Sequence, residues 1–172
     1  MKTLLLLRHA KSDWDDVSVD DHDRPLNARG QKAAPRMGRL MRDLGLIPAL
    51  CLSSTAVRAR DTATLAIAEM AADVPVQYLR ELYSFGDGEA IAAAIAVHGG
   101  SASPLLVVTH NPATQAFALD TISGGDTFGL GQLRMKYPTG GLARIDYDIA
   151  SWSEIPASKG QLKGFWRPRD LM

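Results

Sequence analysis

The chain has 172 residues, 46% of them hydrophobic and 22% charged, which is ordinary for a soluble globular protein and fits a single domain over residues 1–172. Its 19 basic residues are balanced by 19 acidic ones, so it lacks the basic excess of a nucleic-acid-binding protein. The longest apolar run, residues 90–97, is far shorter than the ~20 residues of a membrane span, and the single cysteine, Cys51, excludes an internal disulfide. We therefore expect a cytoplasmic protein whose partners are neither nucleic acid nor membrane.

The first third of the chain predicts a buried strand and a long helix with a polar segment between them. Residues 3–7 form a continuous apolar run, and a run without alternation is typical of a strand buried on both faces. Residues 13–23 contain six aspartates and predict a loop. Asn27 is a favourable N-cap for a helix that ends near Gly45, and Pro35 predicts a kink or a new start within that helix.

The middle of the chain alternates predicted strands and helices. Residues 49–52 indicate a second buried strand, and an alanine-rich helix over residues 55–70 follows it. Residues 74–78 predict a short strand, which the proline inside it places near a sheet edge. Asp87 then caps a helix that ends at Gly99, because glycine is favoured just after the last helical turn.

The last third of the chain completes the expected fold. Residues 105–108 form another apolar strand, and the Asn-Pro pair at 111–112 begins a helix. The glycine-rich residues 123–131 predict a mobile loop. Residues 142–149 alternate apolar and polar side chains, which predicts a one-sided edge strand paired with residues 161–166. Together these elements predict an α/β domain of three layers (α/β/α) with a mostly parallel sheet and an antiparallel edge strand.

Two of the buried strands end in the same way. One runs into Arg8 and His9, and another runs into His110. Because ligands of parallel α/β sheets bind beyond the carboxyl ends of the strands, we expect the two histidines to face one pocket. Arg58 lies in the first turns of a helix, whose N-terminus favours anions. The sequence therefore predicts a phosphate site; the alternative is that each histidine only completes hydrogen bonds at a strand end.

Several motifs resemble those of a known family. They are LLRHAK (residues 6–11), SSTAVRARDTA (53–63) and VVTHNP (107–112), with the lesser landmarks RPL (24–26), Gly30 and PTGGLA (138–143). In this order, over nearly the whole chain, they resemble the histidine phosphatase superfamily and, within it, the small SixA-type phosphohistidine phosphatases. The resemblance implies a phosphoglycerate mutase-like fold.

The resemblance also implies a role for each site residue. His9 would be the nucleophile that forms a phosphohistidine intermediate, and Arg8, Arg58 and His110 would bind the phosphoryl oxygens. Arginine suits this task because its planar guanidinium stays charged and binds oxyanions in a bidentate manner. No metal and no other cofactor is implied, since the guanidinium groups supply the positive charge. The histidines of the chain also lack metal-binding spacing; they are His9, His22, His98 and His110.

The implied substrate is a phosphohistidine of a signalling protein. Two alternatives stay open: a general phosphatase of small phosphate esters that uses the same site, and a non-catalytic module that binds a phosphorylated ligand.

Two features depart from the wider family. Ala10 stands where glycine is common, which leaves the chemistry intact, and the asparagine of the mutases is missing around residues 13–15, which disfavours mutase activity. The oligomeric state cannot be predicted from these motifs.

Glu81 is the candidate for the acid that protonates the leaving group, because it follows the short strand 74–78, where many members of the superfamily place a catalytic glutamate. The alternative is a solvated loop carboxylate. A sugar or alkyl alcohol needs such an acid, whereas a phosphoimidazole leaves as imidazole, whose conjugate acid has a pKa of ~6.5. A site without a dedicated acid therefore favours phosphohistidine or aryl phosphates.

Four further features have simpler interpretations. The aspartates of residues 13–23 lack the spacing of an EF-hand and predict a solvated lid beside the pocket. Trp14 is expected to pack, as are the other two tryptophans, and the alternative is that it lines the mouth of the pocket. Four basic residues share one face of the first helix, which predicts a solvated face or a docking face for an acidic protein; they are Arg29, Lys32, Arg36 and Arg39. Cys51 is expected to be a small buried residue within a strand.

Overall fold

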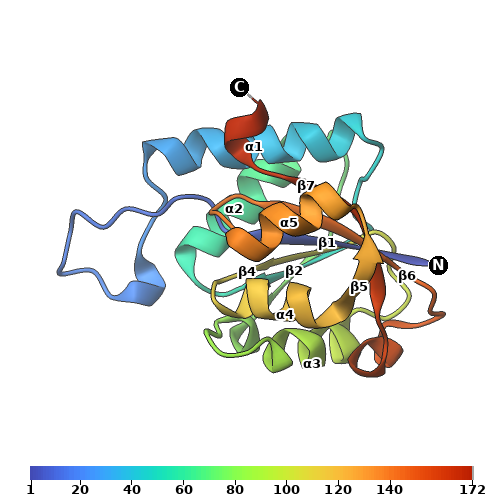
Figure 1. Ribbon diagram of the computed structural model, residues 1–172. Helices are drawn as coiled ribbons and strands as arrows, with labels where there is room; N and C mark the ends of the chain where they lie inside the picture. The colour runs from blue at the N-terminus through green and yellow to red at the C-terminus, as the bar shows by residue number, and fades with distance from the viewer. Residues whose placement is uncertain (172) are drawn as a thin grey trace.

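The computed structural model describes residues 1–171, which form one seven-stranded sheet between helices (Figure 1). The strands are β1 (Lys2–Arg8), β2 (Leu50–Ser54), β3 (Val76–Leu79), β4 (Leu105–Thr109), β5 (Ile122–Gly125), β6 (Leu142–Tyr147) and β7 (Gly160–Trp166). Their order is β3-β2-β4-β1-β6-β7-β5. Strands β3, β2, β4 and β1 are parallel, β6 runs antiparallel to both β1 and β7, and β5 is parallel to β7.

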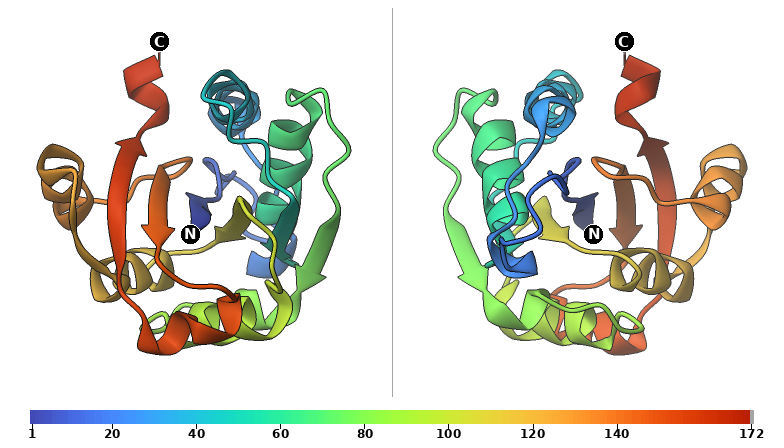
Figure 2. Two further views of the ribbon diagram at one scale, coloured as in Figure 1. Left: turned by 90° about the vertical axis from the view of Figure 1, so that its right-hand side faces the viewer. Right: turned by 90° about the vertical axis from the view of Figure 1, so that its left-hand side faces the viewer.

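The helices cover both faces of this sheet (Figure 2). They are α1 (Ala28–Asp43), α2 (Val57–Ala68), α3 (Glu89–His98), α4 (Ala113–Thr121) and α5 (Thr127–Met135), with the short 3₁₀ helices η1 (Asp21–Asp23), η2 (Arg80–Leu82), η3 (Trp152–Ala157) and η4 (Pro168–Leu171). Helices α1 and α2 pack on one face, while α3, α4 and η3 pack on the other. The predicted three-layer α/β class with a mostly parallel sheet is confirmed.

The central strands form the core of the domain. Leu4 and Leu6 of β1 contact the cluster beneath α3 and α4, while Leu5 and Leu7 contact the cluster beneath α1 and α2. Because successive side chains of a strand point to opposite faces, a strand covered on both sides must be apolar at every position. This explains why the run at residues 3–7 shows no alternation, and it fixes the end of β1 as a rigid platform.

The antiparallel region differs from the expectation in its position. β6 is not an edge strand, because it pairs with β1 on one side and with β7 on the other; the sheet edges are β3 and β5. The alternation in its sequence arises because Arg144 and Asp146 lie half-buried on one face, where they pair with each other at 3.1 Å. Two paired polar residues on one face give the same alternating sequence pattern as a solvent-exposed face, so the pattern does not show that β6 has a neighbour on each side.

One other local expectation was wrong, and of the kink or new start expected at Pro35 the new start does not occur. The segment 123–131 is not a mobile loop: it contributes most of β5 and the start of α5, whose Leu133 is fully buried in the core. Burial of Leu133 compensates for glycine's low helix propensity. Likewise, α1 continues through Pro35 without a new start, although its N-cap is as predicted, since Asn27 Oδ1 accepts from the Gly30 amide at 2.9 Å.

Three other expectations are confirmed. Cys51 is fully buried within β2, β3 is an edge strand, and Gly99 follows the last residue of α3. Within residues 1–171, the helices are too short or too polar to cross a bilayer.

Candidate active site

The candidate site lies where the adjacent parallel strands β1 and β4 end. Arg8 and Thr109 are paired residues of the two strands, so the residues that follow them, His9 and His110, leave the sheet side by side. The two ring centroids lie 5.1 Å apart, and both imidazoles are buried. The structure therefore brings together the two histidines that the sequence predicted to share a pocket.

The orientation of the His9 ring is fixed by its neighbour. His9 Nδ1 lies 2.7 Å from the carbonyl oxygen of Ala10, and because a carbonyl only accepts hydrogen bonds, Nδ1 must carry the proton. Nε2 is then the nitrogen with the free electron pair. Burial lowers the pKa of His9 to about 3, the hydrogen bond to Ala10 acts in the opposite direction, and the charges of Arg58 and Arg8 lower it further. The ring is neutral at physiological pH.

The residue after His9 is also hydrogen-bonded to α2. The Ala10 amide donates to Thr62 Oγ1 at 3.0 Å, and that hydroxyl donates to the carbonyl oxygen of Arg58 at 2.6 Å. The chain beyond β1 is thus held against the first turns of α2. Ala10 is fully buried at this contact, so the alanine in place of the family's common glycine is accommodated.

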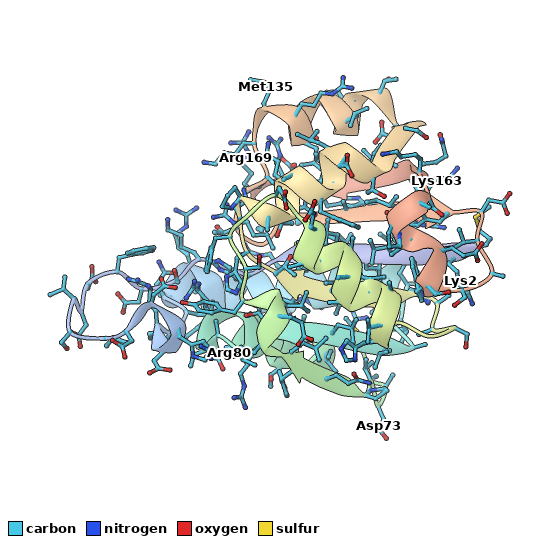
Figure 3. All side chains as sticks on the ribbon, turned by 90° about the horizontal axis from the view of Figure 1, so that it is seen from below. Lys2, Asp73, Arg80, Met135, Lys163 and Arg169 are labelled. Atoms are coloured by element: carbon cyan, nitrogen blue, oxygen red, sulfur yellow. The ribbon has the colours of Figure 1, made fainter. Side chains whose placement is uncertain are left out.

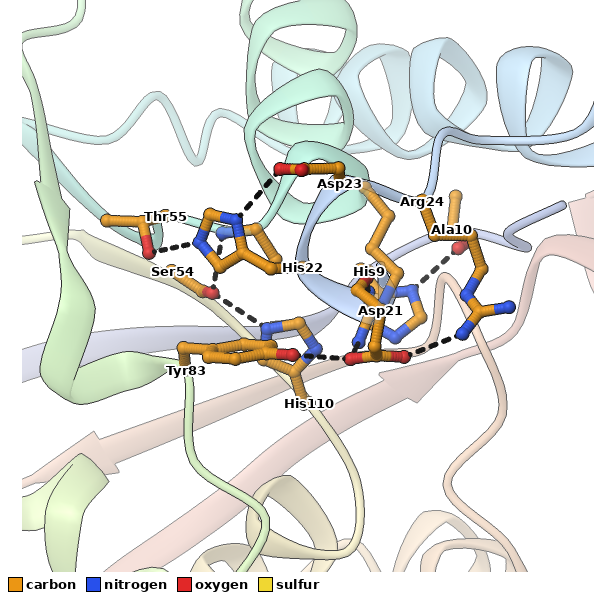
Figure 4. A network of polar contacts seen from close by, with 12 residues as sticks. His9, Ala10, Asp21, His22, Asp23, Arg24, Ser54, Thr55, Tyr83 and His110 are labelled. Atoms are coloured by element: carbon orange, nitrogen blue, oxygen red, sulfur yellow. Dashed lines mark hydrogen bonds and ion pairs between the residues drawn. The ribbon is translucent and has the colours of Figure 1, made fainter. Parts of the chain in front are cut away.

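His110 is held by the end of β2. Its Nε2 lies 2.7 Å from Ser54 Oγ, which in turn accepts from the Ala56 amide at 3.1 Å. His110 Nδ1 is buried and has no partner within residues 1–171; in Figure 4 it lies on the side of the ring that faces Asp21 and His9. Burial first, and then the neighbouring His9 and Arg58, lower the pKa of His110, so this ring is neutral as well.

The two predicted arginines reach the same place from different elements. Arg58, in the first turn of α2, is almost completely buried. Arg8, at the end of β1, is half-buried and donates from Nη1 to the carbonyl oxygen of Tyr137 at 2.8 Å. The charges of both arginines act on His9 and His110. Arg60, two residues along α2, is exposed and lies 4.7 Å from the ring of Tyr78, outside this cluster.

Asp21 is a site residue that the sequence did not single out. In Figure 4 its carboxylate lies at the centre of a network: Oδ2 accepts from Arg58 Nη2 at 3.0 Å and from Tyr83 Oη at 2.6 Å, and Oδ1 accepts from Arg24 Nη2 at 2.9 Å. Burial acts to raise the pKa of Asp21, but the hydrogen bonds from Tyr83, Arg24 and Arg58 lower it below the usual range. The segment 13–23 is therefore not simply a solvated lid, because Asp21 joins it to the cluster.

An aromatic wall borders the site on the side of η2. The Tyr83 ring lies 5.4 Å from His110, and Phe85, which is partly exposed, lies 5.0 Å from the same ring. His22 packs edge-on against Tyr83 at 4.9 Å and hydrogen-bonds Thr55 Oγ1 at 2.8 Å. Sequence reasoning missed this wall, because aromatic residues after a short strand give no specific signal.

The segment before β6 holds the end of β1 through its backbone. The Gly140 amide donates to the carbonyl oxygens of Arg8 and His9 at 3.0 Å, and the carbonyl oxygen of Gly141 accepts from the Arg8 amide at 3.0 Å. Gly140 has a φ of 75°, in the left-handed region that favours glycine. This explains the first glycine of the PTGG motif.

Glu81 does not join the cluster. Its carboxylate lies 3.6 Å from His98 Nε2, at the end of α3, and half of its side chain is exposed. Trp14 is exposed and stacks under the guanidinium of Arg24 at 3.4 Å. Within residues 1–171, there is no group of three or more His, Cys, Asp or Glu side chains placed to hold a metal ion.

Comparisons with known proteins identify the family of this chain. The profile of the histidine phosphatase superfamily (branch 1) matches residues 4–96. An uncharacterized protein of Mycobacterium tuberculosis (strain H37Rv) is 37% identical over 166 residues, which cover 95% of this chain and 100% of that protein. The chain belongs to the histidine phosphatase superfamily.

Solved structures refine the assignment. The proposed phosphohistidine phosphatase SixA of Agrobacterium tumefaciens superposes with a TM-score of 0.79 at 29% identity, covering 97% of this chain and 99% of that one. The proposed SixA of Nakamurella multipartitia gives a TM-score of 0.80 at 29% identity, covering 97% and 96%. Within the superfamily the chain is of the SixA type, and these relationships support a phosphatase.

Proposed function

We propose that the protein hydrolyses phosphohistidine on a signalling protein through a covalent intermediate on His9. The observation that carries the proposal is the His9 ring, whose Nδ1 is committed to the Ala10 carbonyl at 2.7 Å. Nε2 therefore presents an electron pair beside Arg8, Arg58 and His110. A nucleophilic histidine must be neutral to attack, and burial keeps the pKa of His9 at about 3.

In this proposal Arg8, Arg58 and His110 bind the oxygens of the transferred phosphoryl group. Asp21 uses two of the N–H donors of Arg58, and because a guanidinium carries about five such donors, the others are available to an oxyanion. His110 offers Nδ1, which has no partner within the described chain. Phosphoryl transfer depends mainly on positioning and on charge stabilisation, and these three groups supply both.

The proposed reaction has two steps. His9 Nε2 attacks phosphorus, the P–N bond of the substrate breaks, and its electron pair returns to the leaving imidazole, which departs neutral when its other nitrogen is protonated. Water then attacks the phosphoryl group on His9. The N–P bond to His9 breaks, inorganic phosphate leaves, the proton of water passes to solvent or phosphate, and Nε2 regains its electron pair.

The carboxylates near the site favour a leaving group that needs no acid. Asp21 is held ionised by Tyr83, Arg24 and Arg58, so it has no proton to give. Glu81 lies against His98 instead of the cluster. Imidazole, with a conjugate-acid pKa of ~6.5, leaves without protonation by the enzyme, whereas an alkoxide does not. This contrast supports phosphohistidine over alkyl phosphates as the substrate class.

The experiment compares phosphoimidazole, a phosphohistidine protein, an aryl phosphate and an alkyl phosphate as substrates, each with and without EDTA. We expect the highest kcat/KM for the phosphohistidine compounds, little turnover of the alkyl phosphate, and no loss with EDTA because the guanidinium groups supply the charge. In the wild type, rapid acid-free quenching captures an acid-labile phosphoryl label on the chain. His9→Ala abolishes turnover and labelling, while the matched control His98→Ala retains both.

The outcomes separate the alternatives. Preferential turnover of alkyl phosphates would replace the proposal with a general small-molecule phosphatase. Tight binding of a phosphohistidine protein without release of phosphate would indicate a binding module. Full activity of His9→Ala would overturn the mechanism in either case.

A further inference from the structure

A cavity of about 640 Å³ lies beside the candidate site, and Arg8 belongs to both. It is formed by the end of β1 and the chain after it, the start of α1, the end of α5 and the segment that follows it, and the start of η4 with the residue before it. Six cationic side chains line it, namely Arg8, Lys11, Arg29, Lys136, Arg167 and Arg169, and no carboxylate does. The whole chain is neutral, with 19 basic and 19 acidic residues, so this concentration does not follow from composition.

Most of these cations have no counter-charge. Within residues 1–171, Arg167 pairs with Asp170 at 2.7 Å, whereas Lys11, Arg29, Lys136 and Arg169 form no salt bridge. Like charges gathered in one concavity repel one another and raise the local concentration of anions. The arrangement costs stability to the free protein, and a bound anionic group offsets that cost.

The rim of the cavity indicates that its ligand is a protein. Met135, at the end of α5, lines the cavity and is 88% exposed. Figure 3 shows Met135 and Arg169 near each other on one side of the molecule, far from Lys163 and Lys2. Methionine and aromatic side chains are enriched in protein interfaces, whereas a small polyanion gains no binding energy from contact with apolar side chains.

We propose that this basic cavity docks an acidic segment of the phosphoprotein substrate, with Met135 contacting an apolar side chain next to the acidic residues. The inference rests on the proposed function, because Arg8 joins the cavity to the phosphoryl site. A segment that fills the cavity therefore lies directly beside the reacting phosphohistidine. The sequence predicted that the basic face of α1 is either solvated or a docking face. Of its four residues, only Arg29 lines the cavity, and Arg39 pairs with Glu69 at 3.2 Å.

The test uses two phosphohistidine peptides of equal length, one with glutamates flanking the phosphohistidine and one with glutamines, together with phosphoimidazole. For Lys136→Glu/Arg169→Glu we expect kcat/KM for the glutamate peptide to fall about tenfold or more, mainly through KM, as for a lost steering charge. Phosphoimidazole turnover stays unchanged, because neither residue belongs to the proposed catalytic group. The matched control Lys163→Glu changes none of the three.

Binding is measured separately from catalysis. In the His9→Ala background, the glutamate peptide without its phosphoryl group should bind more tightly than the glutamine peptide, and salt should weaken that preference. Equal affinities and unchanged KM values in the double variant would overturn the docking surface while leaving the proposed function intact. Failure of the wild type to hydrolyse phosphoimidazole and either peptide would overturn the proposed function instead.

A small polyanion is the competing occupant. Inorganic tripolyphosphate should compete only weakly with the glutamate peptide if the cavity is shaped for a protein. If Lys136→Glu/Arg169→Glu instead impairs tripolyphosphate binding or cleavage and leaves the peptide KM unchanged, the cavity is a polyphosphate site and the proposal is wrong.

Discussion

The parallel half of the sheet contributes side chains to the site, whereas the antiparallel half contributes backbone. Strands β1 and β4, which are buried on both faces, present His9 and His110, and the first turn of α2 presents the buried Arg58. The chain before β6 presents the Gly140 amide and the Gly141 carbonyl, which hold the end of β1. The residues that carry out the reaction and the backbone that positions them therefore come from different halves of the sheet. Substitutions in the parallel half should mainly lower kcat, whereas substitutions in the antiparallel half should mainly lower stability.

The largest expected effect is in the parallel half. Arg58→Ala removes a buried guanidinium from beside His9, and loss of one such donor typically lowers kcat by ~10²–10³. Arg60→Ala, which removes an exposed arginine from the same helix, serves as the control and leaves kcat unchanged. Steady-state kinetics with phosphoimidazole measure both. Similar rates for the two variants would show that Arg58 does not act on the phosphoryl group.

A smaller effect is expected in the antiparallel half. Gly140→Ala forces a φ of 75° on alanine and brings its Cβ to 2.6 Å from Pro168 Cγ. A left-handed residue costs ~1–2 kcal/mol, so Tm should fall by several degrees, with activity falling as the end of β1 shifts. Gly131→Ala, inside α5 with no neighbouring atom within 4 Å, is the control and should raise stability slightly. Equal Tm values for both variants would remove the role of Gly140.

The pH dependence of stability sharpens the same comparison, because it reports on side chains of the parallel half. The pKa of His9 is about 3 in the folded protein against ~6.5 when unfolded, so the unfolded state binds more protons between these values. The free energy of unfolding should therefore fall as the pH decreases from ~6.5 to ~3, by at most ~1.4 kcal/mol per pH unit for this residue.

His110 contributes in the same direction, and Asp21, whose pKa is lowered, adds a loss below ~3.9, its usual unfolded value. Urea unfolding of the wild type and of His9→Ala between pH 4 and 7 makes the measurement. We expect a shallower slope for the variant, and identical slopes would show that His9 is not buried in its neutral form.

The smallest effect is expected for Glu81→Gln, because its carboxylate faces His98 and not the site. Turnover of phosphoimidazole and of an alkyl phosphate should both stay at the wild-type level. A general acid contributes ~10²–10⁴ in rate, so a selective loss of that size with the alkyl phosphate would restore the catalytic role predicted from the sequence.

The site residues that could be predicted from the sequence are those that directly follow a buried strand. A continuous apolar run identifies β1 and β4, and the residues just after each run must lie at the same sheet edge, so the proximity of His9 and His110 was predictable. Asp21 was not, because its position depends on Arg58, Arg24 and Tyr83, and one aspartate among six carries no distinguishing signal. The contacts that select it come from residues distant in the chain.

The same limit applies to the fold. Alternation in residues 142–149 predicted a strand correctly but not its neighbours, since Arg144 and Asp146 pair on one face and imitate an exposed edge. The glycines of residues 123–131 predicted a loop, yet burial of Leu133 holds α5 in place. Local patterns identify elements, whereas sheet order and the helicity of a glycine-rich segment depend on tertiary packing.

The hydrogen bond between His9 and Ala10 also determines the regiochemistry of any adduct on this ring. With Nδ1 bound to the carbonyl oxygen at 2.7 Å, a phosphoryl group can attach to Nε2 alone, which gives the tele isomer. Isomer-specific antibodies or ³¹P spectra should accordingly detect tele-phosphohistidine on this chain and no pros form.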